Sequence, residues 1–182
     1  AGKDKHALHA FDLKASKLQP KPLIELADYD FEGQLVTADG KLLGVSYLSD
    51  ARATVWFDPA MKEVQARIDA LLPGTVNMVC VAQRAETPWV LVTSYSDIQP
   101  VTMALFNKET GKLNKIGGMR EQIDPARMAS KELVRYKARD DLEIPAWLTV
   151  PKGSKRKGLP MVVLVHGGPF VRGDEWGWDG EV

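Results

Sequence analysis

The chain has 182 residues, of which 45% are hydrophobic and 26% are charged, and its 24 basic and 24 acidic residues leave no net charge. This balance is typical of a folded globular protein and argues against nucleic acid or a charged membrane surface as a partner. No apolar run approaches the roughly 20 residues of a membrane span.

The single cysteine, Cys80, excludes an internal disulfide and a cysteine-based zinc site. It lies in the apolar run 76–81, which predicts a buried, unreactive thiol. The compartment stays undecided between cytoplasm and periplasm.

Three segments in the first 118 residues repeat one pattern. They are ALHAFDLKASKL at 7–18, ATVWFDPAMKEV at 53–64 and TMALFNKETGKL at 102–113. In each of them, apolar residues lead into Phe-Asp or Phe-Asn, and a Leu or Val follows seven residues after the Phe. The successive Phe residues are 46 and 49 residues apart.

A second pair of segments, 43–50 and 90–97, matches at a spacing of 47 residues, and both segments end in Ser-Asp. A repeat of this length, built from short β-rich segments, is typical of the blades of a β-propeller. We therefore expect about two and a half blades in residues 1–118. Propellers close with about four to eight blades, so residues 1–118 are either a small irregular β domain or part of a larger ring, and the periodicity favours the ring.

One helix is predicted inside the second repeat. Asp58 is a suitable N-cap, and Pro59 fits the first helical position. Four apolar residues follow at helical spacing: Ala60, Val64, Ile68 and Leu71. Pro73 then ends the run. These signals predict a helix over residues 59–71, inserted within a blade.

The second part of the chain starts with a change of pattern. Residues 119–131 lose the alternation of the strands and are expected to link two domains. A hairpin follows, with predicted strands at 132–138 and 144–150. The five residues from Met161 to Val165 are then all apolar. Such a run predicts a strand buried on both faces, as in a parallel sheet covered by helices.

This apolar run ends in His166-Gly167-Gly168-Pro169. Glycines adopt backbone conformations that other residues avoid and let another group approach the main chain, while proline prevents the strand from continuing. Several α/β-hydrolases end a buried strand in this way and place a backbone N–H beside a developing oxyanion. An ordinary Gly-Gly turn after a core strand is the alternative, and the four residues alone leave both interpretations open.

Two longer stretches carry a family resemblance: ARDDLEIPAWLTVPKG at 138–153 and LPMVVLVHGGPFVRGDEWGWDGEV at 159–182. They resemble the start of the catalytic domain of the prolyl oligopeptidase family of serine peptidases, in its branch of dipeptidyl aminopeptidases and acylaminoacyl peptidases. The upstream repeats resemble the last blades of that family's propeller. The resemblance implies a mixed fold, with a partial β-propeller at 1–118, a linker at 119–131 and the first part of an α/β-hydrolase domain at 132–182.

The family's activity is hydrolysis of peptide or acyl-peptide bonds in short peptides by a Ser-His-Asp triad, behind a propeller that restricts access. By resemblance, the backbone N–H of Gly168 donates to the oxyanion. His166 either lines the site or only packs beneath the loop. The expected substrate-binding residues are Gly167, Pro169 and Arg172, with an ordinary surface role as the alternative for Arg172. The resemblance implies no metal and no cofactor.

The chain departs from the family in its triad. No Gly-x-Ser-x-Gly motif for a nucleophile occurs in the sequence, and the nearest string, at 44–48, lacks the second glycine and places Ser46 in a predicted strand. The histidines of the chain are His6, His9 and His166. In this family the Ser, Asp and His follow the oxyanion loop in that order. We therefore expect the triad beyond Val182 and the chain to be an inactive piece of a longer enzyme.

A non-catalytic module for binding or scaffolding, with a degenerate hydrolase segment, is the alternative interpretation. Either way, a buried strand at 161–165 would lack the helices and neighbouring strands that cover it. Exposed edges and apolar patches promote association. We therefore expect the isolated chain to self-associate or to be poorly ordered after about residue 130.

Overall fold

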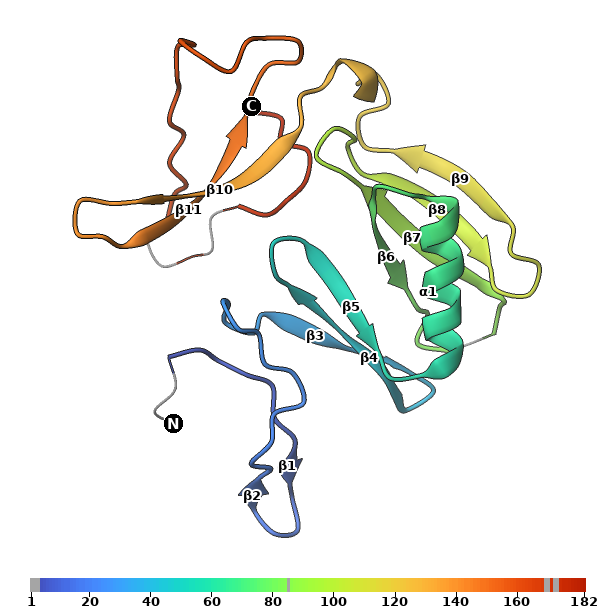
Figure 1. The fold of residues 1–182 in the computed structure, drawn as a ribbon. Coiled ribbons are helices and arrows are strands. Elements are labelled where there is room, and N and C mark those ends of the chain that lie inside the picture. The colour runs from blue at the N-terminus through green and yellow to red at the C-terminus, as the bar shows by residue number, and fades with distance from the viewer. Residues whose placement is uncertain (1–3, 85, 169–170, 172–173) are drawn as a thin grey trace.

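The computed structural model describes residues 4–84, 86–168, 171 and 174–182, and its regular structure is mostly β, as the sequence predicts (Figure 1). The strands form antiparallel sheets, namely two separate hairpins, one three-stranded sheet and one four-stranded sheet. Within the described residues the sheets do not close into a barrel or a ring. No helix in this part of the chain is long and apolar enough to cross a membrane.

The elements follow the chain in simple order. The first hairpin pairs β1 (Phe11–Asp12) with β2 (Lys17–Leu18). The three-stranded sheet contains β3 (Gly33–Ala38), β4 (Lys41–Leu48) and β5 (Arg52–Trp56). After helix α1 (Pro59–Leu71), the four-stranded sheet contains β6 (Val76–Cys80), β7 (Trp89–Tyr95), β8 (Thr102–Asn107) and β9 (Leu113–Gly118). A short 3₁₀ helix, η1 (Pro125–Arg127), precedes the second hairpin of β10 (Lys131–Lys137) and β11 (Glu143–Thr149).

The repeated segments occupy equivalent places in these sheets. Segments 43–50 and 90–97 fall on β4 and β7, the second strand of each larger sheet. Phe57 directly follows β5, and Phe106 lies near the end of β8, the third strand of each sheet. The internal repeat is therefore a repeat of antiparallel meanders.

The Asp or Asn of each repeat accepts a hydrogen bond from the backbone amide three residues later. The Oδ1 atom of Asp12 accepts hydrogen bonds from the amides two and three residues later, at 2.9 and 3.0 Å. Asn107 does the same at 3.0 and 2.9 Å, and Asp58 accepts from the amide three residues later at 2.9 Å. Short polar side chains favour this conformation because they satisfy backbone donors at a chain reversal.

The element after this turn differs between the repeats. In the first and third, the chain returns as a strand, and the residue seven positions after the Phe pairs with it, Leu18 with Phe11 and Leu113 with Phe106. In the second repeat the turn starts α1 instead. The helix therefore connects the three-stranded sheet to the four-stranded sheet, at the place where the other two repeats have a returning strand.

The predicted bounds of the helix, 59–71, are confirmed, as is the N-cap Asp58. Its buried face agrees with the predicted one at Val64 and Ile68, whereas the third buried residue is Met61. Ala60 is exposed and Leu71 is half exposed. The helix packs between two sheets, and this tertiary setting rotates the buried stripe towards Met61.

The core lies beneath α1, beside the four-stranded sheet (Figure 1). Its buried side chains come from β5, α1, β6, β7 and β8 and are Trp56, Met61, Val64, Ile68, Val79, Val90, Val92 and Phe106. Above this core, the guanidinium of Arg67 lies 5.3 Å from the ring centroid of Phe106 and donates to the carbonyl of Lys108 at 2.8 Å.

Two predictions from apolar runs are wrong. Residues 161–165 form no strand and are 60–89% exposed. A central strand needs neighbours on both edges and cover on both faces, and the described residues supply neither. Cys80 is also exposed, because it ends β6 at the rim of the sheet. The hairpin predicted at 132–138 and 144–150 does form, one residue earlier in each strand.

We predict that Ile68→Ala destabilises the chain by about 2–5 kcal/mol, because Ile68 is fully buried and the substitution leaves a cavity in a packed core. Leu71→Ala is the matched control on the same helix, and it should change the free energy of unfolding by less than about 1 kcal/mol because Leu71 is half exposed. Urea unfolding followed by circular dichroism measures both. Equal losses in the two variants would contradict the assigned face of the helix.

Candidate functional site

The loop that the resemblance singles out lies at the surface. The ring Nδ1 of His166 is 3.0 Å from the carbonyl oxygen of its neighbour Gly167. Gly168 has a φ of +67°, in the left-handed region, and its carbonyl accepts from the amide of Val171 at 3.0 Å. The chain therefore makes a tight turn after His166. Pro169 and Arg172, the other expected site residues, lie outside the described residues.

The two glycines of this loop have different requirements. A Cβ atom on Gly167 would meet nothing within 4 Å, and one on Gly168 would have ordinary contact with Val171 at 3.4 Å. There is therefore steric room for a larger residue at both positions. The backbone conformation nevertheless favours glycine at position 168, since L-residues adopt a positive φ only with strain.

The rejected nucleophile and the other histidines lie elsewhere. Ser46 is in β4, as predicted, and its hydroxyl donates to the carbonyl of Gln34 at 3.4 Å. The ring of His6 is 3.6 Å from the carboxylate of Asp30, and the ring of His9 contacts the carbonyl of Gln19 at 2.9 Å. Within the described part of the chain, no three His, Cys, Asp or Glu side chains gather as metal ligands.

A charged cluster that the sequence analysis missed lies just beyond the loop, around Lys131. The Lys131 side chain is only 5% exposed. Its ammonium group pairs with the carboxylate of Asp174 and donates to the carbonyl of Glu175 at 3.1 Å. It also lies 5.4 Å from the ring centroid of Trp147. The backbone amide of Lys131 donates to the carboxylate of Asp97 at 2.8 Å.

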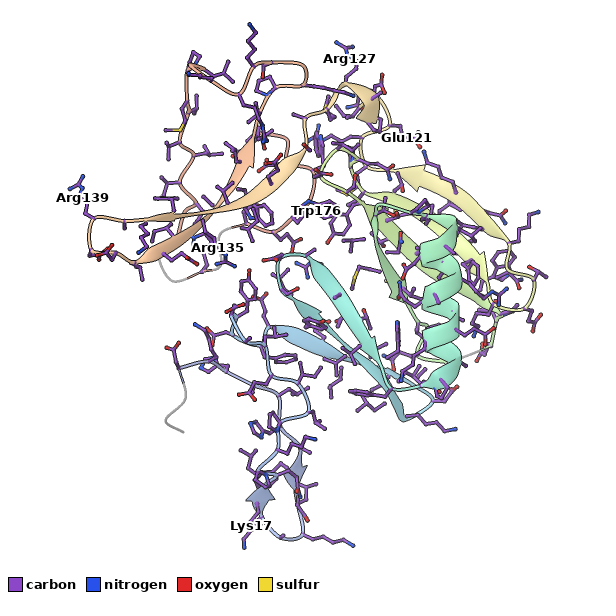
Figure 2. All side chains as sticks on the ribbon, in the orientation of Figure 1. Lys17, Glu121, Arg127, Arg135, Arg139 and Trp176 are labelled. Atoms are coloured by element: carbon purple, nitrogen blue, oxygen red, sulfur yellow. The ribbon has the colours of Figure 1, made fainter. Side chains whose placement is uncertain are left out.

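The same cluster reaches the three-stranded sheet. The Glu175 carboxylate pairs with the guanidinium of Arg52 at 3.2 Å. The next residue, Trp176, donates its amide to the carbonyl of Asp50 at 2.7 Å. Figure 2 accordingly shows Trp176 between the second hairpin and the larger sheets. Residues 174–176 thus connect the loop region to both β10 and β5.

Tyr95 is buried next to this cluster, beneath Gly177. A Cβ atom on Gly177 would approach its ring to 3.2 Å, so the chain passes closely over it. Burial raises the pKa of the Tyr95 hydroxyl, the charge of Glu175 raises it further, and Arg52 opposes the shift. Among the described residues, neither this hydroxyl nor Oε2 of Glu175 has a hydrogen-bond partner with good geometry.

A cavity of about 40 Å³ lies beside Lys131, with Asp97, Trp178 and Asp179 in its lining. Ligand pockets usually measure about 300–1,000 Å³. This cavity therefore has room for a few water molecules, and it is too small for a peptide.

One sequence signal pointed to part of this cluster. Asp50 and Asp97 are the equivalent last residues of the matched segments 43–50 and 90–97. Both of them contact the second half of the chain. The acidic and basic residues of the cluster are spread from residue 50 to residue 175, and no local pattern links them.

Comparison with known protein families finds no matching family model. Over 189 aligned positions, covering 98% of this chain, the sequence is 29% identical to dipeptidyl aminopeptidase BIII of Pseudoxanthomonas mexicana. This relative is a peptidase, and the chain spans about a quarter of its length, 26%. The similarity supports a relationship between the present chain and peptidases.

We predict that the free energy of unfolding falls as the pH rises above 10, the ordinary pKa of tyrosine, in part because of Tyr95. The folded state holds the Tyr95 proton more tightly than the unfolded state, so this stability is present below pH 10 and is lost through the raised pKa. Tyr95→Phe should therefore show a shallower alkaline loss, whereas Tyr136→Phe, at an exposed position, should follow the wild type. Denaturant unfolding between pH 8 and 12 measures this. Parallel profiles for all three proteins would contradict the role of Tyr95.

Proposed function

We propose that this chain is part of a serine peptidase that hydrolyses peptide or acyl-peptide bonds of short peptides. The observation that carries the proposal is the similarity to a dipeptidyl aminopeptidase, which extends over 98% of the chain rather than over one motif. The whole enzyme would be considerably longer, since the chain spans 26% of that relative.

The repeated meanders support a propeller in the first half. A propeller blade is a four-stranded antiparallel sheet, and β6 to β9 form such a sheet. The three strands β3 to β5 with α1 in the fourth place form a variant of it, and β1 and β2 correspond to the last two strands of a preceding blade. In this proposal residues 1–118 are the last blades of a ring that restricts access to the active site.

The second half would open an α/β-hydrolase domain. The β10–β11 hairpin precedes the apolar run 161–165, whose high exposure supports the idea that further strands and helices of the whole enzyme cover it. Left uncovered, this run is the reason to expect self-association of the isolated chain.

In the proposed site, the Gly168 N–H stabilises the negative charge that develops on the substrate carbonyl oxygen. His166 shapes the loop, and Gly167, Pro169 and Arg172 contact the substrate. The nucleophilic serine attacks the carbonyl carbon, a histidine takes the serine proton and passes it to the leaving amine, and an aspartate orients the histidine. The triad would lie outside these 182 residues, because they contain no Gly-x-Ser-x-Gly motif.

A binding or scaffold module is the competing function, and the missing nucleophile motif is the observation in its favour. A fluorophosphonate probe, which labels activated serines, separates the two. The full-length gene product should be labelled and should release dipeptides or acyl-amino acids from chromogenic peptides, whereas the 182-residue chain should do neither. Absence of labelling in a folded full-length product would favour the module, and labelling of the short chain that Ser46→Ala abolishes would place the nucleophile in β4.

We predict that Gly168→Pro lowers kcat of the full-length enzyme by at least about 10²–10³-fold, because proline removes the N–H donor to the oxyanion and, with its φ fixed at a negative value, also distorts a loop in which Gly168 has a φ of +67°. Gly168→Ala is the matched control, since alanine keeps the N–H and its Cβ has room at 3.4 Å from Val171. It carries only the strain of the positive φ and should lose much less activity. Steady-state kinetics on folded variants measures the difference. Equal kcat values for the two variants would contradict the donor role.

A further inference from the structure

An irregular stretch, residues 151–168, follows the second hairpin. It forms no helix or strand, and all of its residues are exposed apart from Ser154, which is partly buried. In Figure 1 it runs at the edge of the molecule, away from the two larger sheets. Endopeptidases cut folded proteins mainly in such exposed loops, because the substrate chain must enter the protease as an extended strand.

The first part of this stretch, residues 151–158, is strongly basic, and we call it the basic loop. Its basic residues are Lys152, Lys155, Arg156 and Lys157, and no acidic residue occurs between positions 150 and 168. The ammonium group of Lys152 donates to the carbonyl of Ala126, and Arg156 pairs with Glu132. That ion pair is exposed, and exposed pairs are weak. The loop thus offers consecutive Lys and Arg side chains to an endopeptidase with an acidic specificity pocket.

The backbone of the basic loop is accessible as well. Within the described residues its hydrogen bonds are local: the amide of Ser154 donates to the carbonyl three residues earlier at 3.1 Å, and the amide of Lys157 to the carbonyl two residues earlier at 2.8 Å. A Cβ atom on Gly153 or Gly158 would meet nothing within 4 Å, so the chain stands clear of its surroundings there. Such local bonds break without unfolding the sheets.

The tip of the second hairpin shows that an exposed basic side chain is not sufficient for cleavage. Arg139 is exposed there (Figure 2), but its turn is closed by a hydrogen bond from the amide of Ala138 to the carbonyl of Leu142 at 2.8 Å. The ladder between β10 and β11 continues directly from this turn. A protease could extend this turn only by breaking the pairing of the two strands.

We propose that the basic loop is a processing site, at which an endopeptidase specific for Lys or Arg converts the protein into a two-chain form. The peptide bond after Lys155, Arg156 or Lys157 is hydrolysed. One water molecule supplies the oxygen of the new carboxylate, and its protons pass to the nitrogen of the next residue, which becomes a new amino terminus. The site would be the same in a peptidase and in a binding module, because it depends only on this loop.

Contacts around Lys131 hold the second piece in place after the cut. The ammonium group of the buried Lys131 pairs with Asp174, which lies beyond the cut in the sequence. The amide of Trp176 donates to the carbonyl of Asp50, on the first piece, at 2.7 Å. Separation of the pieces would leave a buried ammonium group without its partner, which is costly. The two pieces therefore remain one particle.

Brief digestion with trypsin, followed by mass spectrometry, tests the site in the 182-residue chain and in the full-length gene product. The first cut should follow Lys155, Arg156 or Lys157 in both proteins. The triple variant with Lys155→Gln, Arg156→Gln and Lys157→Gln should be cut in this loop at least about tenfold more slowly, because the specificity pocket loses its charged partner. Arg139→Gln is the matched control and should be cut like the wild type. A first cut outside the basic loop in either protein would overturn the proposal.

Subtilisin, which has broad specificity, separates loss of the recognised side chains from loss of exposure. It should cut both the wild type and the triple variant first within residues 151–168. Protection of this stretch from subtilisin in the wild type would contradict the accessibility on which the site depends.

Two further measurements test the two-chain form. After the tryptic cut, both pieces should elute together in size-exclusion chromatography and should separate in urea. The protein purified from its own source cells should contain a second chain that begins at Arg156, Lys157 or Gly158, as read by amino-terminal sequencing. Release of the second piece without denaturant, or intact chains only in the source cells, would overturn the processing role and leave the proposed function untouched.

Discussion

The burial of one face of α1 joins parts of the fold that no hydrogen-bond ladder connects. Strands β5 and β6 are consecutive, yet they belong to different sheets. Side chains from both sheets meet the helix in one core, where Ile68 and Phe106 are fully buried. Since apolar burial is worth about 25 cal/mol per Å² and the ladders stop at the sheet borders, side-chain packing under α1 sets how the two sheets face each other.

Structural features that depend on only a few neighbouring residues could be predicted from the sequence. Asp58 and Pro59 start the helix through local geometry, and the second hairpin follows from alternation around a polar turn. The buried face of the helix could not be predicted to the residue, because the two sheets that flank it decide whether Ala60 or Met61 points inwards. In the same way, a turn at Gly168 follows from its sequence, whereas the Lys131 cluster depends on contacts across more than 40 residues.

The apolar run 161–165 shows the limit of a one-dimensional pattern. The composition of these residues is that of a buried strand, yet burial requires partners on two edges and two faces. The described residues leave the run exposed and outside any sheet, beside the loop of His166. A hydrophobic pattern therefore indicates that a segment favours burial, and the rest of the fold determines whether the segment is buried.

The Asp or Asn of each repeat ends one element in a way that does not determine whether a strand or a helix follows. In each repeat the Asp or Asn ends one element by satisfying the next backbone amides, and this function is independent of whether a strand or a helix comes afterwards. Two repeats continue as hairpins and one as a helix. Such a junction makes the end of the meander tolerant of either element, since the same side-chain cap can precede a returning strand or, at Asp58, the first turn of a helix.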